Sequence, residues 1–311
     1  MQRKAVVKIL VSALMLLLVL RVVDFTSLTQ TLLGISPYTT VIVLVGYLAG
    51  QVLSSYKWWI IAKSGSVDVP YIVALRAYFI GMYVNSFGFG TVGGDVTRGI
   101  LLADSKPLKT EAVTSVIADR AHGLAVLAII GIVATIVTKG HTIHQLFEYL
   151  LYAIAIAIIV GWFMGPKLIE IVVPANSRFR EKALSVSGQF PRRTGIVIYI
   201  TILSVCFHLL QIALHGVMAH GVGAELQWVD LLVAIPFVNI LGSLPVSWQG
   251  LGVRETAYIF FLSGSLTNEQ AVAFGAMWLL AVVTCSAIGG IVAVLTGKLP
   301  KRPLRAESVL N

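Results

Sequence analysis

Two glycine-rich segments of this 311-residue chain each carry an arginine in a setting that suits phosphate. The first segment runs from Asn85 to Arg98 and the second from Asn239 to Glu255. Both read Asn-x-x-Gly, then a pair of glycines, then an acidic residue close to an arginine. A guanidinium group binds phosphate through two parallel donors, and glycine lets the backbone turn tightly and approach a ligand closely. We therefore expect the two segments to form one anion-binding cradle.

The cradle takes its residues from both segments. A helix that starts just after a glycine turn points free N–H groups at the turn, which favours an anion there. We interpret the glycines as the tips, the acids as orienting the arginines, and the asparagines as hydrogen-bonded ties to neighbouring helices. In the alternative, each arginine is a structural pin that binds backbone carbonyls or the nearby acid. The candidate substrate-binding residues are Asn85, Gly93, Gly94, Asp95 and Arg98 in the first segment and Asn239, Gly250, Gly252, Arg254 and Glu255 in the second.

Asp119 and Arg120 are adjacent charges inside the apolar stretch 110–136. A charge at the centre of a membrane span costs about 2.5–3.5 kcal/mol on insertion scales, so such residues usually face the protein interior. Neighbours on a helix point about 100° apart, so the two cannot pair face to face. We expect Asp119 or Arg120 to contact a glycine-rich tip and to belong to the binding site. The alternative is an interfacial pair near the cytoplasmic end of the span, since Glu111 begins the helix only two turns earlier.

The composition requires that these residues be positioned by membrane helices. Hydrophobic residues make up 57% of the chain and charged residues 12%, whereas soluble domains carry about 25% charged residues. The mean hydropathy of +0.89 agrees. The pattern predicts an all-α polytopic membrane protein with about six full spans. The predicted spans are roughly 5–23, 38–56, 111–138, 149–165, 194–218 and 268–297.

Two further apolar stretches, 70–97 and 228–264, are interrupted by Gly, Pro, Asn and charge, and each predicts a re-entrant hairpin. We assign 17 of the 23 lysines and arginines to cytoplasmic positions, including Lys57 and Lys63 in a predicted loop at 57–67. Only Arg21 and Lys139 fall in the opposite loops. Both termini are then expected in the cytoplasm, with the protein in the cytoplasmic membrane.

The charge distribution also predicts an internal repeat. The loops that flank 70–97 are both cytoplasmic by this count, and those that flank 228–264 are both external. The order span, span, re-entrant hairpin, span then occurs twice with opposite orientation, an architecture typical of secondary transporters. We predict a single transmembrane domain over 1–311. Its parts are repeat one at 1–140, repeat two at 145–297 and a short basic cytoplasmic tail at 298–311.

Other chemistries have little support in the sequence. The net charge of +9 lies largely in short loops, where it orients a membrane protein, so we expect no nucleic-acid partner. The two cysteines, Cys206 and Cys285, and the six histidines have no metal-site spacing, so we expect no metal and no cofactor. No Walker A motif, dinucleotide glycine pattern or Gly-x-Ser-x-Gly elbow is present. We expect no catalytic residues and no enzymatic activity.

The motifs resemble those of the lysylphosphatidylglycerol synthase transmembrane region, also called the flippase-like family, which includes the membrane half of the multiple peptide resistance factor. The resemblance covers roughly 5–297 and implies lipid translocation. The chain departs from the family pattern at two places. Residues 87–90 read Phe-Gly-Phe-Gly, where family members often have Pro-Gly, and residues 119–120 read Asp-Arg, where Glu-Arg is commoner. Since 298–311 is too short for the aminoacyl-transferase domain of fused members, we do not expect lysyl-lipid synthesis. The motifs are Gly93-Gly-Asp-Val-Thr-Arg98, Asp119-Arg120 and Leu244-Pro-Val-Ser-x-x-Gly-Leu-Gly-Val-Arg-Glu255.

We expect a translocase that moves an anionic phospholipid or a lipid-phosphate-linked molecule across the membrane. The alternative is a non-catalytic membrane subunit that scaffolds a lipid- or glycolipid-modifying enzyme, docked on the basic loop 166–193. Anionic headgroups would attract that loop equally well. A third hypothesis, an enzyme acting on a lipid headgroup, lacks a recognisable nucleophile–base or metal set. A homo-oligomer is a further possible assembly.

Overall fold

The computed structural model describes residues 2–87, 91–103, 109–138 and 145–297, and this part of the chain contains helices and no strands. The predicted tail 298–311, with Lys106, Lys139 and Gly90, lies outside the described residues. The helices are α1 (Gln2–Leu20), α2 (Phe25–Gly34), α3 (Pro37–Ser64), α4 (Tyr71–Phe87), α5 (Thr91–Leu102), α6 (Lys109–Val137), α7 (Gln145–Val172), α8 (Arg178–Gly188), α9 (Thr194–Gly221), α10 (Trp228–Ser243), α11 (Val253–Phe261) and α12 (Asn268–Leu295).

Five helices, α3, α6, α7, α9 and α12, are long and apolar enough to cross a membrane. A sixth span is present if α1 and α2 count as one, although the two helices are bent by 99° at their junction. The prediction of a polytopic α-helical membrane protein is therefore confirmed. The two interrupted stretches form helix pairs, which we call the first hairpin (α4 and α5) and the second hairpin (α10 and α11).

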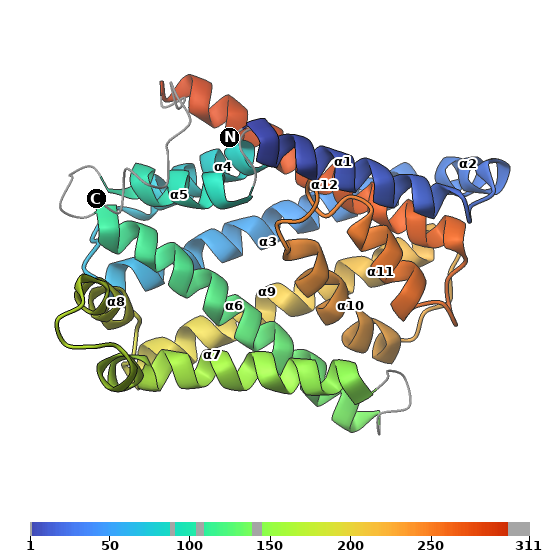
Figure 1. Cartoon of the computed structure of the whole chain (residues 1–311). Coiled ribbons are helices and arrows are strands. Elements are labelled where there is room, and N and C mark those ends of the chain that lie inside the picture. Colours follow the sequence, from blue (N-terminus) through green and yellow to red (C-terminus); the bar gives the residue numbers. More distant parts are fainter. Residues whose placement is uncertain (1, 88–90, 104–108, 139–144, 298–311) are drawn as a thin grey trace.

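The same order of elements occurs twice along the chain. Long helix, short helix, long helix, hairpin and long helix run from α1 to α6 and again from α7 to α12. Helices α3 and α9 pack antiparallel, because Gly46 faces Leu214 while Gly50 faces Gln211. The two hairpins consequently open at opposite ends of the bundle (Figure 1). An inverted repeat requires this arrangement; which end faces the cytoplasm stays a prediction.

Each hairpin packs against the last long helix of the other half. Helix α4 lies on α12, where Gly289 leaves room for the backbone carbonyl of Phe79. Helix α10 lies on α6, where Gly131 faces Pro236. Small residues let membrane helices approach closely, and close packing drives their association because lipid tails are as apolar as the side chains. The crossed packing therefore joins the two halves into one unit.

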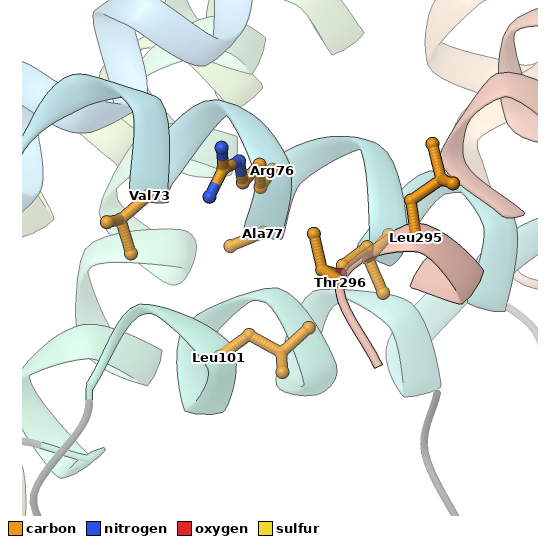
Figure 2. Close-up of a pocket in the computed structure, with 7 residues that line it drawn as sticks. Val73, Arg76, Ala77, Leu101, Leu295 and Thr296 are labelled. Atoms are coloured by element: carbon orange, nitrogen blue, oxygen red, sulfur yellow. The ribbon is translucent and has the colours of Figure 1, made fainter. Parts of the chain in front are cut away.

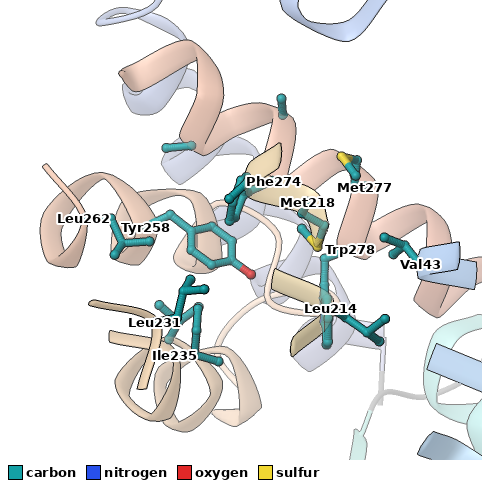
Figure 3. Packing of buried hydrophobic residues seen from close by; sticks show 14 of the residues in the cluster. Val43, Leu214, Met218, Leu231, Ile235, Tyr258, Leu262, Phe274, Met277 and Trp278 are labelled. Atoms are coloured by element: carbon teal, nitrogen blue, oxygen red, sulfur yellow. The ribbon is translucent and has the colours of Figure 1, made fainter. Parts of the chain in front are cut away.

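The largest hydrophobic cluster surrounds the second hairpin (Figure 3). Tyr258 of α11 is fully buried, with Leu231 of α10 beside it and Phe274 and Trp278 of α12 against it. Met218 brings α9 into the same cluster. Aromatic packing of this kind fixes the position of the short helix α11, which begins at the predicted binding tip.

The prediction of a loop at 57–67 is wrong for most of that range, because α3 continues to Ser64. Lys57, assigned to a cytoplasmic loop, is instead buried within α3 with an exposed fraction of 5%. Its ammonium group lies 3.0 Å from a carboxylate oxygen of Asp119, and this pairing lets a charged residue sit inside a packed helix. Lys63 remains half-exposed and pairs with Asp68. The predicted loop 166–193 likewise contains the end of α7 and the whole of α8.

Candidate functional site

The tip of the first hairpin is built on close contact between its two arms. A side chain at Gly94 would collide with the Gly81 carbonyl and Asn85, and one at Gly81 with Arg98. The Asn85 side-chain oxygen accepts a hydrogen bond from the Gly94 amide at 2.9 Å. Asn85 thus ties α4 to α5 within its own hairpin, whereas we expected a tie to a neighbouring helix. Within α5, the Thr97 hydroxyl donates a hydrogen bond to the Gly93 carbonyl one turn earlier, at 2.8 Å.

Five charged side chains meet where α5 packs against α3 and α6. The Arg98 guanidinium lies 3.1 Å from one oxygen of Asp119, and Lys57 lies 3.0 Å from the other. Asp95 lies 3.4 Å from Arg98. Arg120 donates to both oxygens of Asp95, at 3.1 and 3.0 Å. The structure therefore brings both Asp119 and Arg120 to the first hairpin, each through a different partner.

The two arginines of this cluster differ in what they can still bind. Arg98 is 4% exposed and stacks over Trp58 and Tyr78, with its guanidinium carbon 4.8 and 5.0 Å from the ring centres. Between two carboxylates and two aromatic rings, Arg98 occupies the role of structural pin that we held as the alternative. Arg120 carries the bidentate pair with Asp95 but leaves 55% of its side chain exposed. Arg120 is thus the accessible cation of the first hairpin.

The tip of the second hairpin turns through two glycines with positive φ, Gly250 at +79° and Gly252 at +80°. L-residues rarely adopt this conformation, so these positions favour glycine. Glu255 is buried, and its carboxylate accepts a hydrogen bond from the Gly252 amide at 2.6 Å. Glu255 therefore caps the start of α11 and forms no ion pair with Arg254 in the described part of the chain.

Arg254 is half-buried and has no carboxylate partner among the described residues. It donates a hydrogen bond to the side-chain oxygen of Asn239 at 2.9 Å, and its guanidinium carbon lies 5.6 Å from the ring centre of Trp278. Its Nε is buried without a hydrogen-bond partner among the described residues. Arg98 forms ion pairs with two carboxylates, whereas Arg254 forms none among the described residues. Asn239 ties α10 to α11, as Asn85 ties α4 to α5.

The two tips touch each other. The Trp248 indole donates to the Ser86 carbonyl at 2.8 Å, and the Gln249 side chain donates to the Ser86 hydroxyl at 3.1 Å. Tyr47 of α3 packs its ring edge-on against Trp278, the ring that lies beside Arg254, with ring centres 5.2 Å apart. The hydrogen bonds to Ser86 therefore join the two hairpins directly.

The model of the lysylphosphatidylglycerol synthase transmembrane region matches residues 5–289. The chain belongs to this family. The resemblance read from the motifs is thereby confirmed, and the family places the chain among multi-pass membrane proteins of lipid metabolism or translocation. A search of curated proteins finds no match to the chain.

Two important positions of this family member escaped the sequence analysis. Lys57 was assigned to a loop because the predicted span ended at 56, although a lysine that continues an apolar helix is itself a signal of an interior partner. Trp248 lies two residues before the first glycine of the second motif, where nothing in the local pattern marks its bond to Ser86. Both contacts join segments far apart in the sequence.

A separate pocket of about 340 Å³ opens beside the first hairpin, between α4, α5 and the end of α12 (Figure 2). Its walls are apolar apart from Arg76 and Thr296, and Arg76 is exposed. None of the predicted site residues lines this pocket. Among the described residues, no group of three His, Cys, Asp or Glu side chains is placed to hold a metal ion.

Proposed function

We propose that this protein is a lipid translocase that moves an anionic phospholipid, or another molecule carried on a lipid phosphate, across the bilayer. The observation that carries the proposal is Arg254, a half-buried arginine beside the glycine tip of a hairpin predicted to enter the membrane, with no carboxylate partner among the described residues. An uncompensated cation in such a place is costly and marks a functional site. A phosphate group would supply the missing negative charge through two parallel hydrogen bonds.

The first hairpin supports the same ligand chemistry. Lys57, Arg98 and Arg120 supply three positive charges, while Asp95 and Asp119 supply two negative ones. The cluster is therefore one positive charge in excess. Arg120 is the accessible member through which that excess would meet an anion. We assign the binding of the phosphate to Arg254 and Arg120, and the positioning of the first tip to Arg98 and Asp119.

The hairpins also suit alternating access. They open at opposite ends of the bundle, and their tips are joined through Ser86 and Trp248. Rocking of one half against the other would expose the joined hairpin tips first to one side of the membrane and then to the other. The proposal requires no covalent step and no cofactor, and we propose no enzymatic activity for this chain.

Translocation of fluorescent phosphatidylglycerol in proteoliposomes tests the proposal. We expect Arg254→Ala to lower the translocation rate about tenfold or more, because hydrogen bonds to a charged group contribute about 1.5–3 kcal/mol. Arg254→Lys keeps the charge but loses the planar fork, so an intermediate rate is expected. Arg21→Ala removes an exposed arginine at the end of α1 and serves as the matched control. Equal rates for Arg254→Ala and the control, at equal folding and reconstitution, would contradict the proposed site.

One feature favours a second function, that of a scaffold for a lipid-modifying enzyme. Helix α8 carries Arg180 and Lys182 and exposes 67% of Phe179, a combination that a partner protein or an anionic membrane surface could contact. Substituting Phe179 and Arg180 together separates the two functions. A scaffold would lose its partner on this substitution and would show no translocation that depends on the tips. A translocase would keep its translocation on this substitution and lose it on substitution of the tips.

A further inference from the structure

Two histidines are buried where α6 packs against α9, close to the charged cluster of the first hairpin. His122 belongs to α6 and His208 to α9, and each is 7% exposed. Each imidazole bonds across the interface, His122 to Thr201 of α9 and His208 to the Gly123 carbonyl of α6. Neither histidine belongs to the site proposed above, and neither pairs directly with a charged side chain among the described residues. Their hydrogen bonds determine which nitrogen of each ring carries the proton.

His122 has a defined tautomer. Its Nε2 lies 3.1 Å from the hydroxyl oxygen of Thr201. That hydroxyl already donates its own hydrogen to the carbonyl of Val197 at 2.7 Å, so it accepts from His122. Nε2 therefore carries the hydrogen in the neutral ring, and Nδ1 presents a lone pair. Nδ1 is buried and has no hydrogen-bond partner among the described residues.

His208 repeats the arrangement. Its Nε2 lies 3.0 Å from the backbone carbonyl of Gly123, which can only accept, so Nε2 again carries the hydrogen. Its Nδ1 is also buried without a partner among the described residues. Buried polar atoms are usually hydrogen-bonded, and two unpartnered imidazole lone pairs at one helix interface require a reason. Both atoms are bases that can accept a proton.

His215 lies seven residues after His208 on α9, and both of its ring nitrogens have hydrogen-bond partners. Its Nδ1 donates to the Gln211 carbonyl at 2.7 Å, so its Nε2 accepts from the hydroxyl of Tyr258 at 2.8 Å. Both nitrogens of His215 are satisfied in the neutral ring. The unpartnered lone pair is thus a property of His122 and His208 and not of every buried histidine in this chain.

The charged groups that face the two imidazoles come from α3 and α6. Lys57 and Asp119 act on both rings, and Lys57 lies against Gly123, next to His122. Helix α7 contributes Trp162, an uncharged ring 5.6 Å from His122. In the resting protein the one excess positive charge of the cluster opposes a further positive charge on either histidine. An anion bound at Arg120 would remove that opposition.

We propose that His122 and His208 form a proton-binding pair that takes up a proton when an anionic lipid phosphate binds at the hairpin tips. The proton comes from solvent and binds the lone pair of one Nδ1, giving an imidazolium, while the lipid brings the compensating negative charge. Because binding linkage is reciprocal, protonation then favours lipid binding by the same factor. The inference rests on the proposed function and adds to it the coupling of lipid movement to protons.

An apolar cluster lies next to this pair of histidines. Ile61, Ala118, Trp162 and Ile200 form a buried apolar cluster around the neighbouring turns of α3, α6, α7 and α9. Among the described residues, the side of the pair that meets this cluster is largely apolar. The arrangement suits coupled transport, in which the proton moves with the conformational change, better than a continuous proton leak.

Proton uptake by the purified protein tests the proposal. Wild-type protein in weakly buffered detergent is titrated with phosphatidylglycerol in mixed micelles, and a pH-indicator dye reports the protons bound. Phosphatidylcholine, which carries no net charge, is the control lipid. We expect an uptake of up to about one proton per bound phosphatidylglycerol, since one negative charge is added. The double variant His122→Gln/His208→Gln should lose most of this uptake, because glutamine keeps a donor for Thr201 and Gly123 but has no basic nitrogen.

His220→Gln is the matched control, since His220 is exposed at the end of the same helix α9 and should leave the uptake unchanged. Equal uptake by wild type and the double variant, or no uptake by wild type, overturns the proposal. If the double variant does not fold, histidine-selective ¹⁵N NMR of wild type replaces it. An Nδ1 signal that stays unprotonated on addition of phosphatidylglycerol then overturns the proposal, and one that becomes protonated supports it.

Lipid translocation measured on the same preparation separates this proposal from the proposed function. Translocation without proton uptake overturns the proton coupling alone. Uptake without translocation supports the linked binding and overturns the translocase function. Absence of both overturns both.

Discussion

The indole nitrogen of Trp248 donates a hydrogen bond to the backbone carbonyl of Ser86 at 2.8 Å, although the two residues are 162 positions apart in the chain. This bond joins the tip of the second hairpin to the last turn of α4. The Ser86 hydroxyl also lies 2.6 Å from the hydroxyl of Ser286 on α12. Because both hairpins meet at Ser86, a displacement of one tip must carry the other with it or break these bonds.

Trp248→Phe should destabilise the protein by about 0.5–1.5 kcal/mol, the usual net contribution of one hydrogen bond. Phenylalanine keeps an aromatic ring but has no donor for the Ser86 carbonyl. Unfolding by denaturing detergent in mixed micelles measures the change. Trp228→Phe is the control, since Trp228 is 60% exposed. An equal loss for both variants would show that the Ser86 bond is not the cause.

Arg98→Ala should cost about 3–5 kcal/mol of stability, because it leaves the buried carboxylate of Asp119 with one partner fewer. In a double-mutant cycle with Asp119→Asn, the second substitution should add much less than it costs alone. The same unfolding assay gives all the values required. Additive costs would contradict direct coupling between the two side chains.

Arg120→Ala should change stability by only about 1 kcal/mol or less, because its pair with Asp95 is half-exposed. Its effect should fall instead on the translocation of fluorescent phosphatidylglycerol, which we expect to slow markedly. Arg98→Ala and Arg120→Ala therefore separate positioning from binding within one cluster. A large loss of stability in Arg120→Ala with no specific loss of translocation would reverse this assignment.

Gly252→Ala should destabilise the second hairpin by about 1–3 kcal/mol, the usual cost of a non-glycine residue held in a rare backbone conformation. Its φ is +80°, and an added Cβ would also approach the Cβ of Met15 on α1 to 2.6 Å. Thermal unfolding of the purified protein measures the effect. Gly264→Ala is the control, since a Cβ there meets no atom within 4 Å. Similar melting temperatures for the two variants would refute the strain argument.

Local physical chemistry was sufficient for much of the architecture. The length of apolar runs determined the spans, and the interruptions by glycine, proline and charge located both hairpins, because insertion costs depend on consecutive residues. The same cost predicted that Asp119 and Arg120 need partners inside the protein. Gly250 and Gly252 lie at the turn of the second hairpin, whereas Gly93 and Gly94, which were predicted to form a tip, lie within the helix α5.

The tertiary structure decided which of these charged side chains pair with each other and which remain unpaired. Two arginines in similar motifs differ because α6 brings Asp119 to Arg98, while the described acids leave Arg254 unpaired. Lys57 is buried because the same carboxylate, 62 residues along the chain, reaches it. The sequence by itself determined that the chain is a membrane protein with two glycine-tipped hairpins, since those features follow from neighbouring residues. Which cation is neutralised and which can bind an anion was decided only by contacts between distant helices, because the charge of a site depends on every group that packing brings to it.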